Sequence, residues 1–165
     1  MTPAYNKKIT RPMEYSELKE AITDLPEDKQ ALLTLLFFAG CRVSEALALT
    51  SDDISYQGDM MYIEFFRLKG SKQTDPQELP KSNWLCEQEG TIFRFSRQTA
   101  WRWTKKIDEQ LYPHFFRQNR FTKTLDRFGA VAVCNTYGVS ITTIENYIGK
   151  IDIKRVGKAL HEELG

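Results

Sequence analysis

Residues 29–49 constrain the fold more than any other part of the chain. The first half of this segment is apolar on nearly every side, which is typical of a helix buried at the centre of a domain. Gly40 interrupts the pattern, and helical periodicity resumes from Cys41 to Leu49. The sequence therefore predicts a central buried helix that turns at Gly40 into a second helix.

The flanking segments predict a mainly α-helical fold with a small β-hairpin, an α+β class. Residues 15–22 have the spacing of an amphipathic helix that Ser16 is placed to cap. Residues 60–68 are rich in β-forming side chains, and turn residues separate them from a second short strand at 78–80. Further helices are expected at 96–111, with Ser96 as the N-cap, and at 115–128, 139–148 and 153–164.

Length and composition indicate one globular domain. The chain has 165 residues, of which 41% are hydrophobic and 27% charged. We expect a basic, flexible lead-in at residues 1–10 and a single domain at 11–165. No apolar run approaches the roughly 20 residues of a membrane span, so a cytoplasmic protein that does not enter membranes is predicted. The three cysteines form no C-x-x-C pair, which favours free thiols over a structural zinc site.

Charge is distributed unevenly along a chain whose net charge is only +1. The charged residues of segment 94–127 are mostly basic, whereas residues 14–28 are rich in Asp and Glu. Such a distribution can present a positive face to phosphates and an acidic face to water. Solvated helix surfaces would give the same pattern, and charge alone does not separate the two interpretations.

Two arginines in unusual positions are candidate anion-binding groups. Arg42 follows Gly40 in the buried turn, and Glu45, one helical turn later, can hold its guanidinium while leaving donors for a phosphate. His114 and Arg117 are also one turn apart. Each pair taken alone is more typical of a simple ion pair or surface pair. Lys69 and Lys72, on the predicted hairpin turn, are by themselves compatible with solvated loop lysines.

Taken in order, these elements resemble the tyrosine recombinase (integrase) family over residues 11–150. AGCRVSEALAL at 39–49 is similar to the family box TGLRISELLAL, and PHFFRQNRFT at 113–122 is similar to the box P-H-x-L/F-R-H-x-x-A-T, with an archaeal or viral flavour. LKGSK at 68–72 resembles the hairpin with the family's lysine. GVSITTIENYIGK at 138–150 resembles the run that leads to the third box.

The resemblance implies DNA strand transfer through a phosphotyrosine, without metal or cofactor. It implies that Arg42 and Arg117 clamp the scissile phosphate and that His114 acts as general acid/base or phosphate donor. It further implies that Lys69, with Lys72 as second candidate, protonates the leaving oxygen, that Lys150 takes the third-box position, and that Glu45 maintains the pocket.

Several positions depart from the family pattern. Lys150 stands where the family has His or Trp, and residues 126–136 look inserted. An ungapped alignment would instead make Arg127 the second arginine. The nucleophilic tyrosine is expected near Ala159 or Leu160, but no tyrosine follows Tyr147. The N-terminal domain that normally completes the family's clamp on DNA is also not recognised.

The sequence thus favours a DNA-binding integrase-fold protein that cannot form the covalent intermediate. Its expected partners are double-stranded DNA and, on DNA, further copies of itself or a full-length recombinase. The residues predicted to contact DNA are basic: Arg97, Arg102, Lys105, Arg120 and Lys123. One alternative is an active recombinase with an unorthodox or missing nucleophile. A second is a helical protein-interaction module.

Overall fold

The structure is a computed structural model that describes residues 12–67, 73–107, 113–148 and 160–165. The helices are α1 (Tyr15–Ile22), α2 (Glu27–Ala39), α3 (Val43–Leu47), α4 (Asn83–Glu87), α5 (Arg97–Ile107), α6 (Pro113–Phe128), α7 (Ala130–Tyr137) and α8 (Ile141–Ile148). The strands are β1 (Ile54–Gln57), β2 (Met60–Ile63) and β3 (Gln77–Pro80), and a 3-10 turn, η2, covers Ser51–Asp53.

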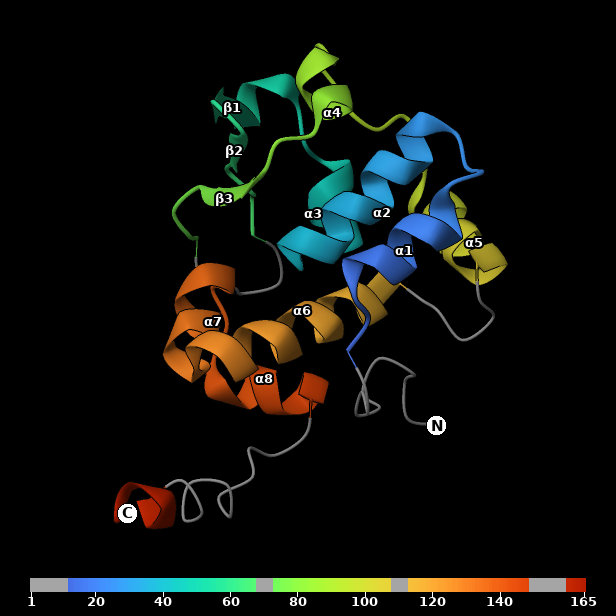
Figure 1. The fold of residues 1–165 in the computed structure, drawn as a ribbon. Helices are drawn as coiled ribbons and strands as arrows, with labels where there is room; N and C mark the ends of the chain where they lie inside the picture. Colours follow the sequence, from blue (N-terminus) through green and yellow to red (C-terminus); the bar gives the residue numbers. More distant parts are fainter. Residues whose placement is uncertain (1–11, 68–72, 108–112, 149–159) are drawn as a thin grey trace.

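The predicted central helix is confirmed as α2. It packs against α1, α3, α4, α6 and β3, and Figure 1 shows it between the sheet and the helices α6–α8. Gly40 ends it in the left-handed conformation with φ of 63°, and the Gly40 N–H donates to the Leu36 carbonyl. Glycine suits this position because a Cβ disfavours positive φ. The chain then turns into α3, as the sequence predicts.

The sheet is antiparallel with the order β1-β2-β3. The predicted hairpin corresponds to β2 and β3, with Ile63 opposite Gln77, but the sequence did not predict β1. β2 itself ends at Ile63, yet alternate residues beyond it remain buried, namely Phe65 and Arg67. Strand-like alternation therefore places the Arg67 side chain on the same face as the core residues Met61 and Ile63.

Two apolar clusters make up the core. The larger surrounds α2, and the smaller joins α6, α7 and α8 through Phe121, Val133, Tyr137 and Ile144. α6 contributes to both, with Phe116 in the first and Phe121 in the second. The sequence described residues 126–136 only as an insertion. The structure shows that most of this segment is α7, which supplies the wall against which α6 and α8 pack.

The helix caps and ends follow the prediction only in part. Ser16 lies inside α1 rather than capping it, and the N-cap is Glu14, whose backbone N–H lies 3.4 Å from Glu17 Oε1. Ser96 does cap α5, because its hydroxyl accepts from the Thr99 N–H at 3.2 Å. The helix expected at 153–164 falls largely outside the described residues. Within the described ranges, no helix has the length and apolarity to cross a membrane.

Candidate functional site

At the C-terminal end of α2, backbone carbonyls accept hydrogen bonds from three side chains, two on α6 and one on β3. The last carbonyls of a helix lack intrahelical partners and carry the negative end of its dipole. The donors are arranged as follows: Arg120 Nε to the Phe37 oxygen at 3.0 Å, Gln77 Nε2 to the Ala39 oxygen at 3.0 Å, and Arg117 Nη1 to the Gly40 oxygen at 2.6 Å. The end of α2 is therefore tied to α6 and to β3.

Three arginines converge on the carboxylate of Glu45 in α3. Arg42 Nη1 lies 3.5 Å from Oε2, Arg67 Nη1 lies 3.6 Å from Oε1, and Arg117 Nη1 lies 4.0 Å from Oε1. The Arg42 backbone N–H also donates to Oε1 at 2.7 Å, which fixes the first turn of α3. We call Glu45 with Arg42, Arg67 and Arg117 the arginine cluster.

Most of the charged side chains in the arginine cluster are buried, so they must be stabilised by one another. The side chain of Glu45 is fully buried, those of Arg67 and Arg117 are 1% exposed, and that of Arg42 is 15% exposed. Removing charges from water is costly unless they are paired and hydrogen bonded. Among the described residues, three guanidinium groups lie around this one carboxylate, so these four side chains together carry more positive than negative charge. Such an arrangement favours an anion near its exposed edge, which is Arg42.

The sequence brought Arg42, Glu45 and Arg117 into one hypothesis, and the structure places all three together. Their proposed roles are a separate matter that the geometry alone does not test. Arg127, the alternative second arginine, is exposed near the end of α6 with its guanidinium 5.3 Å from the Phe128 ring. Ten residues of helix separate it from Arg117, about 15 Å along the axis. The geometry therefore favours Arg117 as the partner of Arg42.

Sequence reasoning missed Arg67, which is a buried member of the arginine cluster. Its Nε lies 3.2 Å from Thr74 Oγ1, and its Nη2 lies 3.4 Å from Gln77 Oε1 and 3.3 Å from the Thr136 oxygen. The signal was available, because Arg67 continues the two-residue alternation of Met61, Ile63 and Phe65. A charged residue on the buried side of a strand pattern indicates a paired or functional group.

His114 lies one turn before Arg117 on α6 and is half-buried. The neighbouring rings of Phe115 and Phe116 pack into the larger core cluster, which fixes the N-terminal turns of this helix. The proposed lysines, Lys69, Lys72 and Lys150, lie outside the described residues. Their relation to the arginine cluster remains a prediction.

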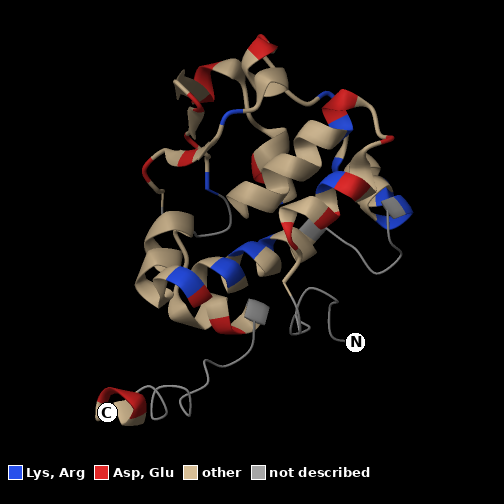
Figure 2. Cartoon of the chain, in the orientation of Figure 1, with Lys and Arg blue, Asp and Glu red and all other residues tan. Residues whose placement is uncertain are grey.

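The residues predicted to contact DNA fall into two groups. On α5, Arg97 and Arg102 are exposed and Lys105 is half-buried with its Nζ 5.6 Å from the Trp101 ring, whereas Ala100, Trp103 and Thr104 are buried. α5 therefore has one apolar face and one basic face. Figure 2 shows basic positions at α5 and along α6.

On α6, the two predicted DNA contacts already have protein partners. Arg120 is half-buried over the rings of Phe37 and Phe38, and burial lowers the pKa of its guanidinium. Lys123 pairs with Glu14 at 2.9 Å, so the basic stretch meets the acidic segment at this point. DNA contacts by these residues remain a prediction, and the structure gives both of them a packing or pairing role in addition.

Cys41 lies next to Arg42 and is buried. Burial, followed by the negative charge of Glu45, raises the pKa of its thiol to about 12. The thiol is therefore neutral at physiological pH and unsuited to nucleophilic or metal-binding chemistry. Among the described residues, no group of three His, Cys, Asp or Glu side chains could hold a metal ion.

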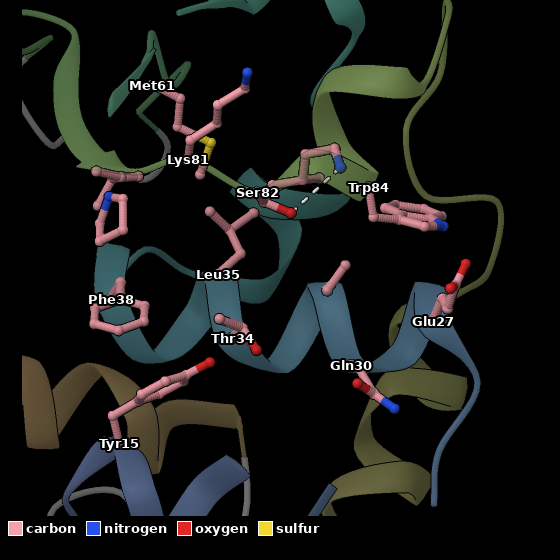
Figure 3. Close-up of a pocket in the computed structure, with 14 residues that line it drawn as sticks. Tyr15, Glu27, Gln30, Thr34, Leu35, Phe38, Met61, Lys81, Ser82 and Trp84 are labelled. Carbon is pink, nitrogen blue, oxygen red and sulfur yellow. Dashed lines mark hydrogen bonds between the residues drawn. The ribbon is translucent and has the colours of Figure 1, made fainter. Parts of the chain in front are cut away.

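A separate concavity of about 400 Å³ runs along one side of α2, from Glu27 to Phe38. Figure 3 shows Trp84 and Glu27 at one end of it and Phe38 at the other, with Tyr15 from α1 and Lys81 from the β3–α4 connection. Its lining is mixed apolar and polar and includes none of the arginine-cluster residues. Nothing in its lining indicates what would occupy it.

No protein-family model and no curated protein sequence matches this chain. Solved structures do. XerH site-specific recombinase bound to difH substrate, in a pre-cleavage complex, is similar with a TM-score of 0.70 at 19% identity, over 93% of this chain and 55% of that one. Tn1549 transposon integrase with transposon right end DNA gives a TM-score of 0.64 at 11% identity, over 97% and 68%.

A third structure, XerA recombinase, has a TM-score of 0.62 at 18% identity, over 94% of this chain and 66% of that one. The chain thus spans little more than half the length of XerH. At such low identity the similarity concerns the fold, which matches these recombinases through nearly the whole chain. The expected fold is confirmed: mainly α-helical with a small antiparallel sheet, the chain has the fold of a tyrosine recombinase catalytic domain.

Proposed function

We propose that this chain binds double-stranded DNA without forming a covalent intermediate, and that it holds one backbone phosphate against the arginine cluster. The observation behind the proposal is the convergence of Arg42 and Arg117, which are far apart in sequence, on the single carboxylate of Glu45. With Arg67 added, three positive charges face one negative charge. A backbone phosphate, with its single negative charge, would offset part of the excess.

Arg42 is the group that would contact the phosphate directly. Its side chain is the most exposed of the three arginines, and its backbone is fixed by the hydrogen bond to Glu45. A guanidinium presents several donors in one plane, so it can pair with Glu45 and with a phosphate oxygen at once. Arg117 and Arg67 would act through the positive potential behind it.

The basic face of α5 would supply further backbone contacts. Arg97 and Arg102 are exposed on a helix whose opposite face is fixed by buried Ala100 and Trp103. A rigid helix with exposed arginines is suited to phosphates and to a DNA groove. Two of the similar structures are described as DNA complexes, XerH with difH and Tn1549 integrase with transposon end DNA. Their fold therefore supports a role on DNA for this chain.

The proposal includes no phosphotyrosine intermediate, because the position where the family has its nucleophilic tyrosine holds other residues here. The family resemblance places the nucleophile near positions 159 and 160, which are Ala and Leu, and the sequence has no tyrosine after Tyr147. The protein would then act as a regulator, an architectural factor or a decoy on DNA, alone, as several copies or beside a full-length recombinase. His114, Lys69 and Lys150 would contribute phosphate contacts rather than chemistry.

Fluorescence anisotropy with duplex DNA tests the binding proposal. We expect the affinity to fall steeply with salt, by a slope of about 0.9 per phosphate contact. Arg42→Ala should lower affinity about tenfold and reduce the slope by about one contact. Lys19→Ala, an exposed lysine on α1, is the matched control and should change neither. Salt-independent binding, or an Arg42→Ala variant that binds like the wild type, would contradict the proposal.

A nicked suicide duplex tests the second half of the proposal, because strand cleavage would be trapped as a covalent complex. The expected result is no protein–DNA band that survives SDS. Such a band would show that another nucleophile operates. Its mapping by peptide mass spectrometry would identify the residue.

A further inference from the structure

The family resemblance gives Arg67 no role, and the proposed function uses only its positive charge. Its guanidinium contacts three separate parts of the chain: Glu45 in α3, Thr74 and Gln77 in and before β3, and the Thr136 carbonyl in α7. The side chain is 1% exposed, so it is enclosed by protein. Arg67 is therefore unsuited to contact DNA itself, and any influence on DNA must pass through a neighbour.

The backbone of Arg67 is fixed as well as its side chain. The Gln73 amide accepts from the Arg67 N–H at 3.3 Å and donates to the Arg67 carbonyl at 3.1 Å. These two hydrogen bonds join the chain beyond β2 to the chain before β3. The Arg67 backbone is thus anchored between the end of β2 and the start of β3, and its guanidinium reaches the arginine cluster from a fixed position.

The neighbour through which Arg67 can act is Glu45. Arg67 approaches Oε1, the oxygen that also accepts the Arg42 backbone N–H and faces Arg117. The Arg42 guanidinium approaches the other oxygen, Oε2, at 3.5 Å. Arg67 and Arg117 therefore balance the carboxylate from the buried side. The electrostatic attraction between Glu45 and the more exposed Arg42 is correspondingly weaker.

We propose that Arg67 is a positioning residue, which partly neutralises Glu45 from the buried side so that Glu45 holds the Arg42 guanidinium less strongly when Arg42 contacts a DNA phosphate. This inference rests on the proposed function. Without the Arg67 charge, the buried carboxylate would interact more strongly with Arg42, because charges in a buried site are weakly screened. Arg42 would then be drawn towards Glu45 and would offer less positive charge to DNA.

A double-mutant cycle in DNA affinity tests this dependence. Arg67→Met and Arg42→Ala are made singly and together, and dissociation constants for one duplex are measured by anisotropy. We expect Arg67→Met to weaken binding about fivefold, and the double variant to bind within about twofold of Arg42→Ala alone, because residues acting through one another are non-additive. Additive losses, or an unchanged Arg67→Met affinity, would overturn the inference.

Removal of the carboxylate charge provides a readout that a merely structural role would not give. If Glu45 draws Arg42 away once Arg67 is absent, Glu45→Gln should restore DNA affinity to the Arg67→Met protein, to within about twofold of wild type. A Glu45→Gln/Arg67→Met protein that binds as weakly as Arg67→Met would refute the mechanism. Arg67→Gln is measured in parallel, so that a folded neutral variant remains if methionine is not tolerated.

Two controls separate the inference from other outcomes. Leu85→Ala, which truncates a buried side chain on α4, lowers stability while leaving the arginine cluster intact, so its DNA affinity should stay at the wild-type value well below its melting temperature. Arg42→Ala alone reports on the proposed function. If that variant binds normally, the proposed function fails; if it binds weakly while Arg67→Met binds normally, only the role of Arg67 fails.

Discussion

The arginine cluster and helix α5 are both basic, yet their charges are held in opposite ways. In the cluster, Arg67 and Arg117 are buried and fixed by a carboxylate and by backbone carbonyls. On α5, Arg97 and Arg102 are exposed, and Arg102 has a hydrogen bond from Nη2 to Thr99 one turn away, at 3.1 Å. Buried charges of this kind support both the fold and a defined geometry, whereas exposed ones provide attraction with little effect on stability.

The largest effect is expected from Glu45→Ala, because it leaves buried arginines without their common carboxylate. The free energy of unfolding should fall by about 3–5 kcal/mol. Denaturant titration followed by circular dichroism measures the change. Glu20→Ala, at an exposed position on α1, is the control and should cost less than about 0.5 kcal/mol. A small loss for Glu45→Ala would show that the buried charges contribute little, which would remove the contrast with α5.

Gly40→Ala tests how closely the end of α2 is packed beside the cluster. A Cβ at this position would lie 2.8 Å from Arg120 Cγ and 2.9 Å from Arg120 Cβ, in addition to having a φ of 63°. Gly58 is a matched control, because its φ is 60° and a Cβ there meets nothing within 4 Å. We expect a loss of about 1 kcal/mol for Gly58→Ala and about 3 kcal/mol for Gly40→Ala, by thermal or chemical unfolding. Equal losses of stability would mean that the Arg120 side chain on α6 moves aside at little cost.

On α5, the double substitution Arg97→Ala/Arg102→Ala should weaken DNA binding and leave the free energy of unfolding nearly unchanged. Two lost phosphate contacts predict a salt slope lower by about 1.8 and an affinity roughly tenfold or more weaker. Unfolding free energy should stay within about 0.5 kcal/mol of wild type, because both side chains are exposed. An unaltered slope would place the DNA elsewhere on the molecule.

The smallest expected effect is a loss of stability at alkaline pH, caused by the buried thiol of Cys41. The folded-state pKa of Cys41 is about 12 against an ordinary value of 9.0, so above pH 9 the unfolded chain loses a proton that the folded chain keeps. Stability should therefore fall as pH rises from 8 to 10, by about 1 kcal/mol from this thiol. Cys41→Ala should lose that part of the pH dependence. If wild type and variant respond identically, the thiol is less enclosed than the structure indicates.

Much of the fold follows from local pattern. The apolar run of α2, the glycine that ends it, the N-cap of α5 and the hairpin of β2 and β3 were all predicted, because each depends on spacing or on turn chemistry in nearby residues. β1 and α7 were missed for the same reason. β1 has a mostly exposed pattern with little alternation in its burial, and α7 is stabilised chiefly by packing against α6 and α8.

In the candidate site, too, some features could be predicted from the sequence and others depend on the tertiary structure. The sequence by itself determined which residues are unusual, since Arg42 after a helix-ending glycine and Arg117 after His114 are conspicuous without coordinates. Only the tertiary structure decided that these arginines share Glu45, that Arg67 joins them, and that Arg127 stands apart at the end of α6. Spacing along the chain limits which residues can share one face of a helix or strand. The meeting of distant side chains depends on how those faces pack, and the cost of burying charge then selects which of them must pair.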